Sequence, residues 1–233
     1  ALTASKELEI TLTGKNCGME ERAPMCGVPY HAVDGYLTKL VSKGYKVAIC
    51  EQVEDPKQAK GIVKREVVRI VTPGTILDAA AIDESKNNYI MCIVYIADRY
   101  GLSVADVTTG DYFVTELPDG QKLKDEIFKF MPSEIICNES FYMSGMDLED
   151  MKNRLGITIY SLESWYFDDE ICKSKLTEHF KVSSLQGLGL SDYDCGVISA
   201  GALLQYLLET QKNDLSHMTH ITPYTTGKYM MLD

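Results

Sequence analysis

Three apolar segments between residues 89 and 117 restrict the folds open to the larger part of this chain. They cover residues 89–97, 102–108 and 112–117 and read as strands joined by short connections. A parallel crossover needs a dozen or more residues, so strands joined this closely pair with antiparallel neighbours. We therefore expect an antiparallel meander.

The segments after the meander alternate in type. Apolar spacing predicts helices near residues 122–130, 147–155, 168–180 and 192–210, and strands at 134–137 and 157–160. The order βββαβα, continued by βα and a final helix, is that of a ribonuclease-H-like α/β domain. This is an argument about fold alone, because one fold hosts many functions.

A smaller unit is predicted before the polar stretch DESKNN at residues 83–88, which is the best candidate linker. Pro29 precedes and Gly44 closes a predicted helix, and strands are expected at residues 9–13, 45–53 and 63–72. We expect a small mixed α/β domain. The apolar face of its helix consists of Val33, Tyr36, Leu37, Leu40 and Val41.

The composition of the chain limits the classes of protein to which it can belong. The chain has 233 residues, 45% of them hydrophobic, enough for one large core or two modest ones. No apolar run reaches the roughly 20 residues that span a bilayer, so we expect no membrane partner. The seven cysteines are scattered without a C-x-x-C pair, which favours reduced thiols and a cytoplasmic protein. Cys17 and Cys26 could approach each other, but a zinc site needs more soft ligands than lie nearby.

The formal charge of −11 is unevenly distributed. Residues 1–80 hold 11 Lys and Arg against 10 Asp and Glu, whereas the later residues hold 12 against 24. A nearly neutral segment can still carry a basic patch, but a strongly acidic one is repelled by phosphates. We therefore expect the earlier and the later part of the chain to have different functions. Because the chain opens in helix-compatible residues and stops on the apolar run YMMLD, we also expect it to be a piece of a longer protein.

Two enzyme classes are disfavoured. A ribonuclease-H-type nuclease needs several carboxylates around two metal ions, one of them in the middle of the first strand. YIMCIVYIA contains none, Asp98 comes after it, and Glu139 alone cannot assemble the site. The phosphate-binding pattern G-x-x-x-x-G-K-[ST] is also missing, so we expect no catalytic residue, metal or ATP site in this chain.

Three motifs carry a resemblance to the MutS family of DNA mismatch repair proteins. They are APMCGVPYHAVDGYLTKLVSKGYKVAICEQVEDP, KREVVRIVTPGT and GALLQYLLETQ, and the similarity runs through the whole chain in the same order. The resemblance implies that residues 1–80 are the later part of the mismatch-recognition domain and residues 83–212 the connector domain, which is ribonuclease-H-like in this family. Residues 213–233 would begin the lever domain.

The family resemblance also implies partners and cofactors. Full-length members form homodimers, bind mismatched duplex DNA and a MutL-like protein, and use ATP and Mg²⁺ in a domain that lies after Asp233. A Phe-x-Glu motif stacks on the mispaired base, and we expect it to precede Ala1. This chain would therefore be non-catalytic and would lack the mismatch-reading motif.

The resemblance points to five DNA-binding residues. The loop at residues 23–31 would lie beside a kinked duplex, where apolar side chains and close backbone contacts act from the minor groove. Met25 would offer a flexible thioether, Gly27 a close backbone approach, and Lys15 a point charge facing the phosphates. The set is Lys15, Pro24, Met25, Gly27 and His31.

Other interpretations stay open. Met25 could fill the core, as most methionines do, and His31 could be a local hydrogen-bonding residue. Tyr30 and Tyr36 are expected to pack rather than to stack on bases. The alternative function is an acidic protein-interaction module that binds a repair partner, with incidental DNA contact.

Overall fold

The structure is a computed structural model that describes residues 1–18, 20–76, 87–213 and 215–226. The chain divides into two compact units, Ala1–Lys86 and Asn87–Asp233, called here the first and second unit. Residues 83–86 of the expected linker lie outside the described residues. Each unit is described by itself.

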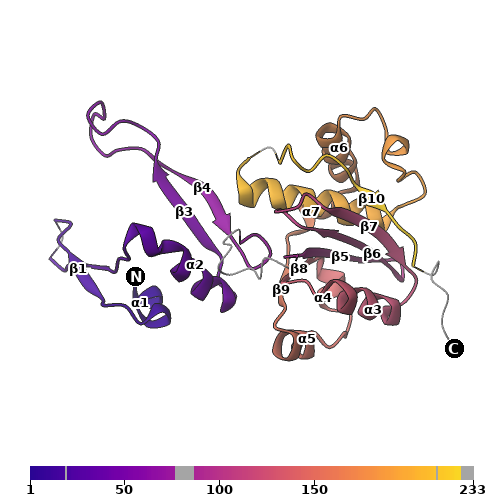
Figure 1. The fold of residues 1–233 in the computed structure, drawn as a ribbon, viewed down its shortest axis with the longest axis horizontal. Helices are drawn as coiled ribbons and strands as arrows, with labels where there is room; N and C mark the ends of the chain where they lie inside the picture. The colour runs from indigo at the N-terminus through magenta and orange to yellow at the C-terminus, as the bar shows by residue number, and fades with distance from the viewer. Residues whose placement is uncertain (19, 77–86, 214, 227–233) are drawn as a thin grey trace. The chain divides into compact units, whose positions relative to one another are not determined.

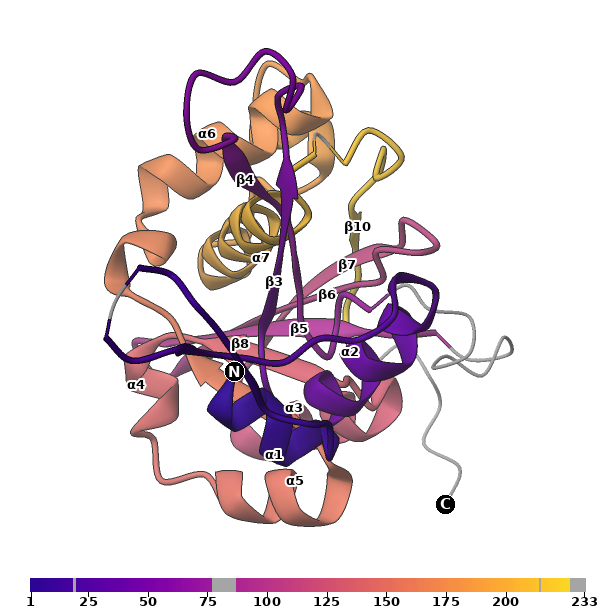
Figure 2. The same cartoon turned by 90° about the vertical axis from the view of Figure 1, so that its left-hand side faces the viewer.

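The first unit is a small α/β arrangement, as predicted (Figure 1). Strands β1 and β2 pair antiparallel, and β3 and β4 form a second antiparallel ribbon that is long and extended (Figure 2). The strand expected at residues 9–13 is wrong, because Glu9 takes a left-handed conformation (φ 57°) that ends α1. The elements are α1 Leu2–Leu8, β1 Thr13–Lys15, β2 Ala23–Met25, the 3-10 helix η1 Tyr30–Ala32, α2 Val33–Ser42, β3 Val47–Gln52 and β4 Arg65–Val71.

Helix α2 begins and ends where the sequence indicates. Pro29, at φ −60°, leads into η1 and α2, and its carbonyl accepts a hydrogen bond from Ala32 N–H at 3.0 Å. Gly44 takes φ 82° and donates its N–H to the Val41 carbonyl at 2.8 Å. The left-handed turn after the helix favours glycine, which has no Cβ to clash.

The second unit is built on a six-stranded sheet of order β10-β7-β6-β5-β8-β9. Strands β5, β6 and β7 pair antiparallel in sequence, which confirms the predicted meander. Strands β8 and β9 extend the sheet parallel to β5, and the ribonuclease-H-like α/β fold class is confirmed. The strands are β5 Ile90–Ile96, β6 Arg99–Ala105, β7 Tyr112–Leu117, β8 Glu134–Cys137, β9 Thr158–Ser161 and β10 Thr222–Pro223.

Helices cover both faces of this sheet. Helices α6 and α7 lie on one face and α3, α4 and α5 on the other (Figure 1). Each face has its own buried apolar cluster, because alternate side chains of every strand point to opposite sides. No described helix has the length and the apolar run that a bilayer crossing needs. The helices are α3 Gly120–Phe130, α4 Glu139–Tyr142, α5 Leu148–Leu155, α6 Asp169–Phe180 and α7 Cys195–Gln211, with 3-10 helices η2 Ser164–Phe167 and η3 Leu185–Leu188.

The packing of the second unit continues beyond Lys212, where the sequence analysis ended the connector. Leu215 and Met218 are 1% exposed and belong to the cluster around α7, and β10 pairs with β7. These apolar residues lie in a segment without regular periodicity, so the pattern did not show them. The assignment of residues 213–233 to a lever domain stays a prediction, and residues 214 and 227–233 lie outside the described ones.

Two glycines allow α7 to approach its neighbours closely. A Cβ on Gly101 of β6 would lie 2.0 Å from the Cys195 carbonyl oxygen, and one on Gly201 of α7 would lie 2.3 Å from the Cys172 Cβ on α6. Real atoms do not approach this closely, so either side chain would push α7 away.

Gly201→Ala is expected to lower the free energy of unfolding of the second unit by about 1–3 kcal/mol or more, since a crowded core resists added volume. Urea unfolding followed by Trp165 emission measures this, because Trp165 is the single tryptophan and belongs to this unit. The control is Gly120→Ala, whose Cβ would meet the Met146 methyl at an ordinary 3.4 Å. Equal stability of the two variants would contradict the close packing.

Candidate nucleic-acid interface

The β1–β2 hairpin determines how the predicted DNA-binding residues are oriented. Its register pairs Thr13 with Met25, Gly14 with Pro24, and Lys15 with Ala23. Paired residues share a face and successive residues alternate, so Lys15 and Met25 lie on one face of the hairpin. Pro24 lies on the opposite face. The structure therefore brings Lys15 and Met25 together and separates them from Pro24.

Local hydrogen bonds hold this hairpin in place. Thr13 Oγ1 donates to the Met25 carbonyl at 3.0 Å, and the Arg22 guanidinium donates to the Gly14 carbonyl at 2.5 Å. In the connecting turn Gly18 takes φ 80° and donates its N–H to Asn16 Oδ1 at 3.0 Å. These bonds order a hairpin that has little apolar burial of its own.

Met25 and Gly27 face away from the core of the first unit. Met25 is 45% exposed, so the alternative that it fills this unit's core is wrong. A Cβ placed on Gly27 would meet no atom within 4 Å, and Gly27 does not need a left-handed conformation. The packing of the described residues therefore gives no reason for glycine at this position, which leaves room for an external contact.

Helix η1 adds a residue that the sequence analysis misjudged. Tyr30 was expected to pack, but it is 90% exposed, on the same turn as the exposed His31. Tyr36 is half-buried, as expected, with the Lys39 ammonium 5.8 Å from its ring centroid. Tyr30 precedes α2 and lies in η1, and its spacing of three residues before Val33 gave no sequence signal for its exposure.

The charge around Lys15 is balanced. Lys15 and Arg22 are exposed at the two ends of the β1–β2 turn, and Glu20 and Glu21 are exposed between them. Two positive and two negative side chains on one short turn give little net attraction for phosphates. We therefore expect the hairpin to bind DNA weakly. Removing one of its basic side chains should lower the affinity, and removing its acidic side chains should raise it.

The second unit lacks a nuclease site in its described part. The middle of β5 holds the fully buried Cys92 and Ile93, and Asp98 lies in the following turn, where it accepts a hydrogen bond from the Tyr95 hydroxyl at 2.8 Å. Glu139 begins α4, after β8. Within the described ranges no three His, Cys, Asp or Glu side chains are placed to hold a metal ion.

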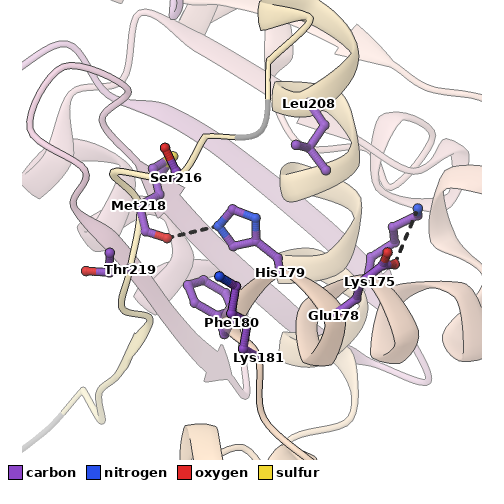
Figure 3. A pocket seen from close by; sticks show the side chains of 9 residues that line it. All are labelled: Lys175, Glu178, His179, Phe180, Lys181, Leu208, Ser216, Met218 and Thr219. Carbon is purple, nitrogen blue, oxygen red and sulfur yellow. Dashed lines mark hydrogen bonds and ion pairs between the residues drawn. The ribbon is translucent and has the colours of Figure 1, made fainter.

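A half-open hollow of about 440 Å³ lies beside α6 and α7 (Figure 3). His179 Nε2 lies 2.9 Å from the Met218 carbonyl oxygen, which makes that nitrogen the donor and ties α6 to the segment around Met218. Lys175 faces Glu178 at 3.9 Å, and within the described part of the chain the hydrogen-bond partner of the imidazole is the Met218 carbonyl rather than a nucleophile or a carboxylate. Catalysis by this histidine would require such a partner, so we assign it a structural role.

Buried thiols do not supply a nucleophile either. Burial raises the pKa of Cys137 and of Cys172 to about 12, so both stay protonated near neutral pH. Cys17 and Cys50 are exposed and Cys26 is half-buried, and all seven cysteines are free. Neither unit brings a base to an activated thiol in the described residues.

Comparisons with known proteins agree with this architecture. Residues 1–80 match the family model of MutS domain I, and residues 88–220 match that of MutS domain II. The DNA mismatch repair protein MutS of Lachnoclostridium phytofermentans is 63% identical over 233 residues, which are 100% of this chain and 25% of the relative. The MutS of Acetivibrio thermocellus is 49% identical over 236 residues, covering 100% of this chain and 27% of the relative. This chain spans about a quarter of the length of the relatives it matches.

Together these features define a multidomain protein in which a small α/β unit precedes a ribonuclease-H-like unit whose first strand, β5, holds no carboxylate. Two matched domains in the order I and II, and relatives aligned over the full chain, identify it further. The chain belongs to the MutS family, and the resemblance stated from its motifs is confirmed.

Gly27→Ala is expected to leave the free energy of unfolding of the first unit within about 0.5 kcal/mol of the original, because the new methyl group meets nothing and Gly27 has no left-handed φ. Gly18→Ala is the matched comparison, and it is expected to cost about 1 kcal/mol, since Gly18 takes φ 80°. Amide hydrogen exchange of the first unit measures both. A larger loss for Gly27→Ala than for Gly18→Ala would show that the structure of the loop is wrong.

Proposed function

We propose that this chain is the part of a DNA mismatch repair protein that supplies backbone and minor-groove contacts from its first unit and a connector from its second unit. The observation that carries the proposal is the shared exposed face of Lys15 and Met25 in residues that match MutS domain I. Tyr30, five residues after Met25 in the chain, is also exposed. A cation and a flexible thioether on one surface suit a minor groove, and an exposed aromatic ring in the same segment offers a further apolar contact. The relatives' name, DNA mismatch repair protein MutS, supports the same role.

The proposal also covers the rest of the protein. Mismatched duplex DNA would be bound by the full-length homodimer in the cytoplasm, with ATP and Mg²⁺ held outside this chain, whose residues do not fit a nucleotide-phosphate site. The connector would dock a MutL-like protein. Crosslinking of the full-length, ATP-bound protein to that partner tests the docking, and no crosslink to residues 83–212 would leave the connector a spacer only.

The alternative is an acidic interaction module whose DNA contact is incidental. The acidity of the residues after Ala80 favours it for the second unit, whereas the nearly neutral residues 1–80 do not. Contacts dominated by phosphates weaken steeply as salt rises, so a salt titration on duplex DNA separates the two functions.

We expect the chain to bind duplex DNA weakly, with a Kd of roughly 10⁻⁴ M or weaker near physiological salt, and without preference for a G·T mismatch. Its sequence contains no Phe-x-Glu motif, and backbone contacts carry no sequence information. Fluorescence anisotropy on matched and G·T duplexes measures both properties. A clear G·T preference would place mismatch reading in residues 23–31 and contradict this account.

Charge variants test which surface makes that contact. At low salt, Lys15→Ala should weaken binding to both duplexes about two- to threefold, and Glu20→Gln with Glu21→Gln should strengthen it by a similar factor. The control is Lys57→Ala, which removes the same charge from an exposed position between β3 and β4. If Lys57→Ala has the larger effect, the contact does not lie on the β1–β2 hairpin.

We further propose that the chain has no catalytic activity of its own. With Mg²⁺ or Mn²⁺ it should cleave neither RNA–DNA hybrids nor duplex DNA and should hydrolyse no ATP, because β5 carries no carboxylate and a phosphate loop is missing. Gel-based cleavage and phosphate-release assays measure this. Metal-dependent cleavage that Glu139→Gln abolishes would overturn it.

A further inference from the structure

The carboxyl ends of β8 and β9 border a hollow in the second unit, for which the connector role proposed above names no contact surface. The two strands are parallel neighbours, and at this edge β8 is followed by Asn138 and helix α4, whereas β9 is followed by residues 162–163 and η2. Ligands of α/β sheets commonly bind outside the carboxyl ends of strands, where diverging loops leave a crevice. The hollow has a volume of about 800 Å³, and its walls include Asn138, Glu139, Tyr142, Met143, Glu163 and Trp165. We call it the β8–β9 groove.

Hydrogen bonds fix both walls of the groove. On one side, the Asn138 side chain accepts the Tyr95 N–H and donates to the Tyr95 carbonyl, both at 3.1 Å, which ties the start of α4 to β5. On the other side, Trp165 Nε1 donates to Glu163 Oε2 at 2.6 Å, and the indole stacks on Tyr166 with 3.9 Å between ring centroids. Walls that are already ordered reduce the entropic cost of binding.

Several large apolar and aromatic side chains that line this groove are exposed to solvent. Met143 is 75% exposed, Trp165 is 43% exposed and Tyr142 is 39% exposed. Methionine and aromatic residues are enriched at the centres of protein interfaces, and Trp and Tyr are frequent hot spots. The apolar part of the groove therefore fits an apolar side chain of another protein.

The charge of the groove is negative. Glu139 and Glu163 line it, and neither has a basic partner among the residues that the structure describes. The nearby Lys152 lies 5.8 Å from the Tyr142 ring centroid and faces Glu149 at 3.9 Å. Because the residues after Ala80 carry twice as many acidic as basic side chains, phosphates are repelled and a cation is attracted.

We propose that the β8–β9 groove is a docking site for a partner-protein segment in which an Arg or Lys adjoins an apolar residue. The apolar side chain packs against Met143 and Trp165, and the cation is held between Glu139 and Glu163. The site lies wholly within the second unit, so it does not depend on the DNA contact proposed for the first unit.

The single tryptophan of the chain, Trp165, makes the test direct, because its emission reports on this groove. The probe is a capped hexapeptide of alternating arginine and leucine, and the control probe replaces arginine with glutamate. The arginine peptide should shift the emission with saturation, and the glutamate peptide should not. Equal responses to the two peptides would overturn the proposal.

Variants locate the binding, measured by anisotropy of the labelled arginine peptide. Glu139→Gln and Met143→Ala, both at exposed positions, should each weaken it about three- to fivefold, as expected for one exposed ion pair or one interface contact. Asp125→Asn, an equal change of charge on α3, should change it less than 1.5-fold. Unchanged binding in both groove variants overturns the proposal, provided that their circular dichroism matches the original.

Two further results would assign the groove to another occupant and so overturn the proposal. One is a dimer of this chain in sedimentation that Trp165→Ala dissociates, since the groove would then hold a second copy. The other is a saturable change in Trp165 emission on addition of duplex DNA. We expect the chain to sediment as a monomer. We also expect the emission of Trp165 to stay unchanged when duplex DNA is added.

Discussion

The close approach of α7 to β6 and α6 is the constraint on which the second unit depends. Gly101 and Gly201 leave no room for a side chain at the two contact points. Buried hydrogen bonds then fix the position of α7 on the sheet: Ser199 Oγ lies 2.8 Å from Ser103 Oγ and donates to the Cys92 carbonyl at 2.9 Å. Satisfied polar groups inside an apolar core select one arrangement among many that would bury similar area.

This packing supports the different roles proposed for the two units. The second unit buries the centre of its sheet between two apolar clusters, so its chemistry lies at the sheet's edges, and the position that would need a nuclease carboxylate is filled by core residues. In the first unit, the buried apolar side chains of the described residues are Leu8, Val41, Val71 and Pro73, and the hairpin and η1 expose Met25 and Tyr30. A small core with exposed apolar side chains suits contact with a partner, whereas the larger core suits a rigid connector.

The sequence predicted most of the fold. The meander, strands β8 and β9, and helices α3, α5, α6 and α7 were predicted from the apolar pattern of the sequence, and α7 reads as a long apolar run because it is buried on nearly every side. The short elements were not predicted, because α4 has four residues and β10 has two, which are too few to show a periodic apolar pattern. The close contacts at Gly101 and Gly201 could not be predicted either, because they depend on which elements pack against each other in the folded unit.

The candidate site was less predictable. The family resemblance supplied Lys15, Pro24, Met25, Gly27 and His31, but residues 23–31 were treated as one loop. Their first three residues form β2, and only its register with β1 shows that Lys15 and Met25 share a face while Pro24 does not. The exposed acids of the same turn, which weaken the attraction for phosphates, were counted in the sequence but could not be placed next to Lys15.

The central claim is that the first unit contacts DNA and the second contacts proteins. Methyl NMR of the chain with ¹³C-labelled methionine, titrated with duplex DNA at low salt, tests it in one experiment, because Met25 reports on the hairpin and Met143 on the β8–β9 groove. The account predicts that the Met25 methyl signal shifts with added DNA while that of Met143 does not. A shift of Met143 with Met25 unchanged would contradict it.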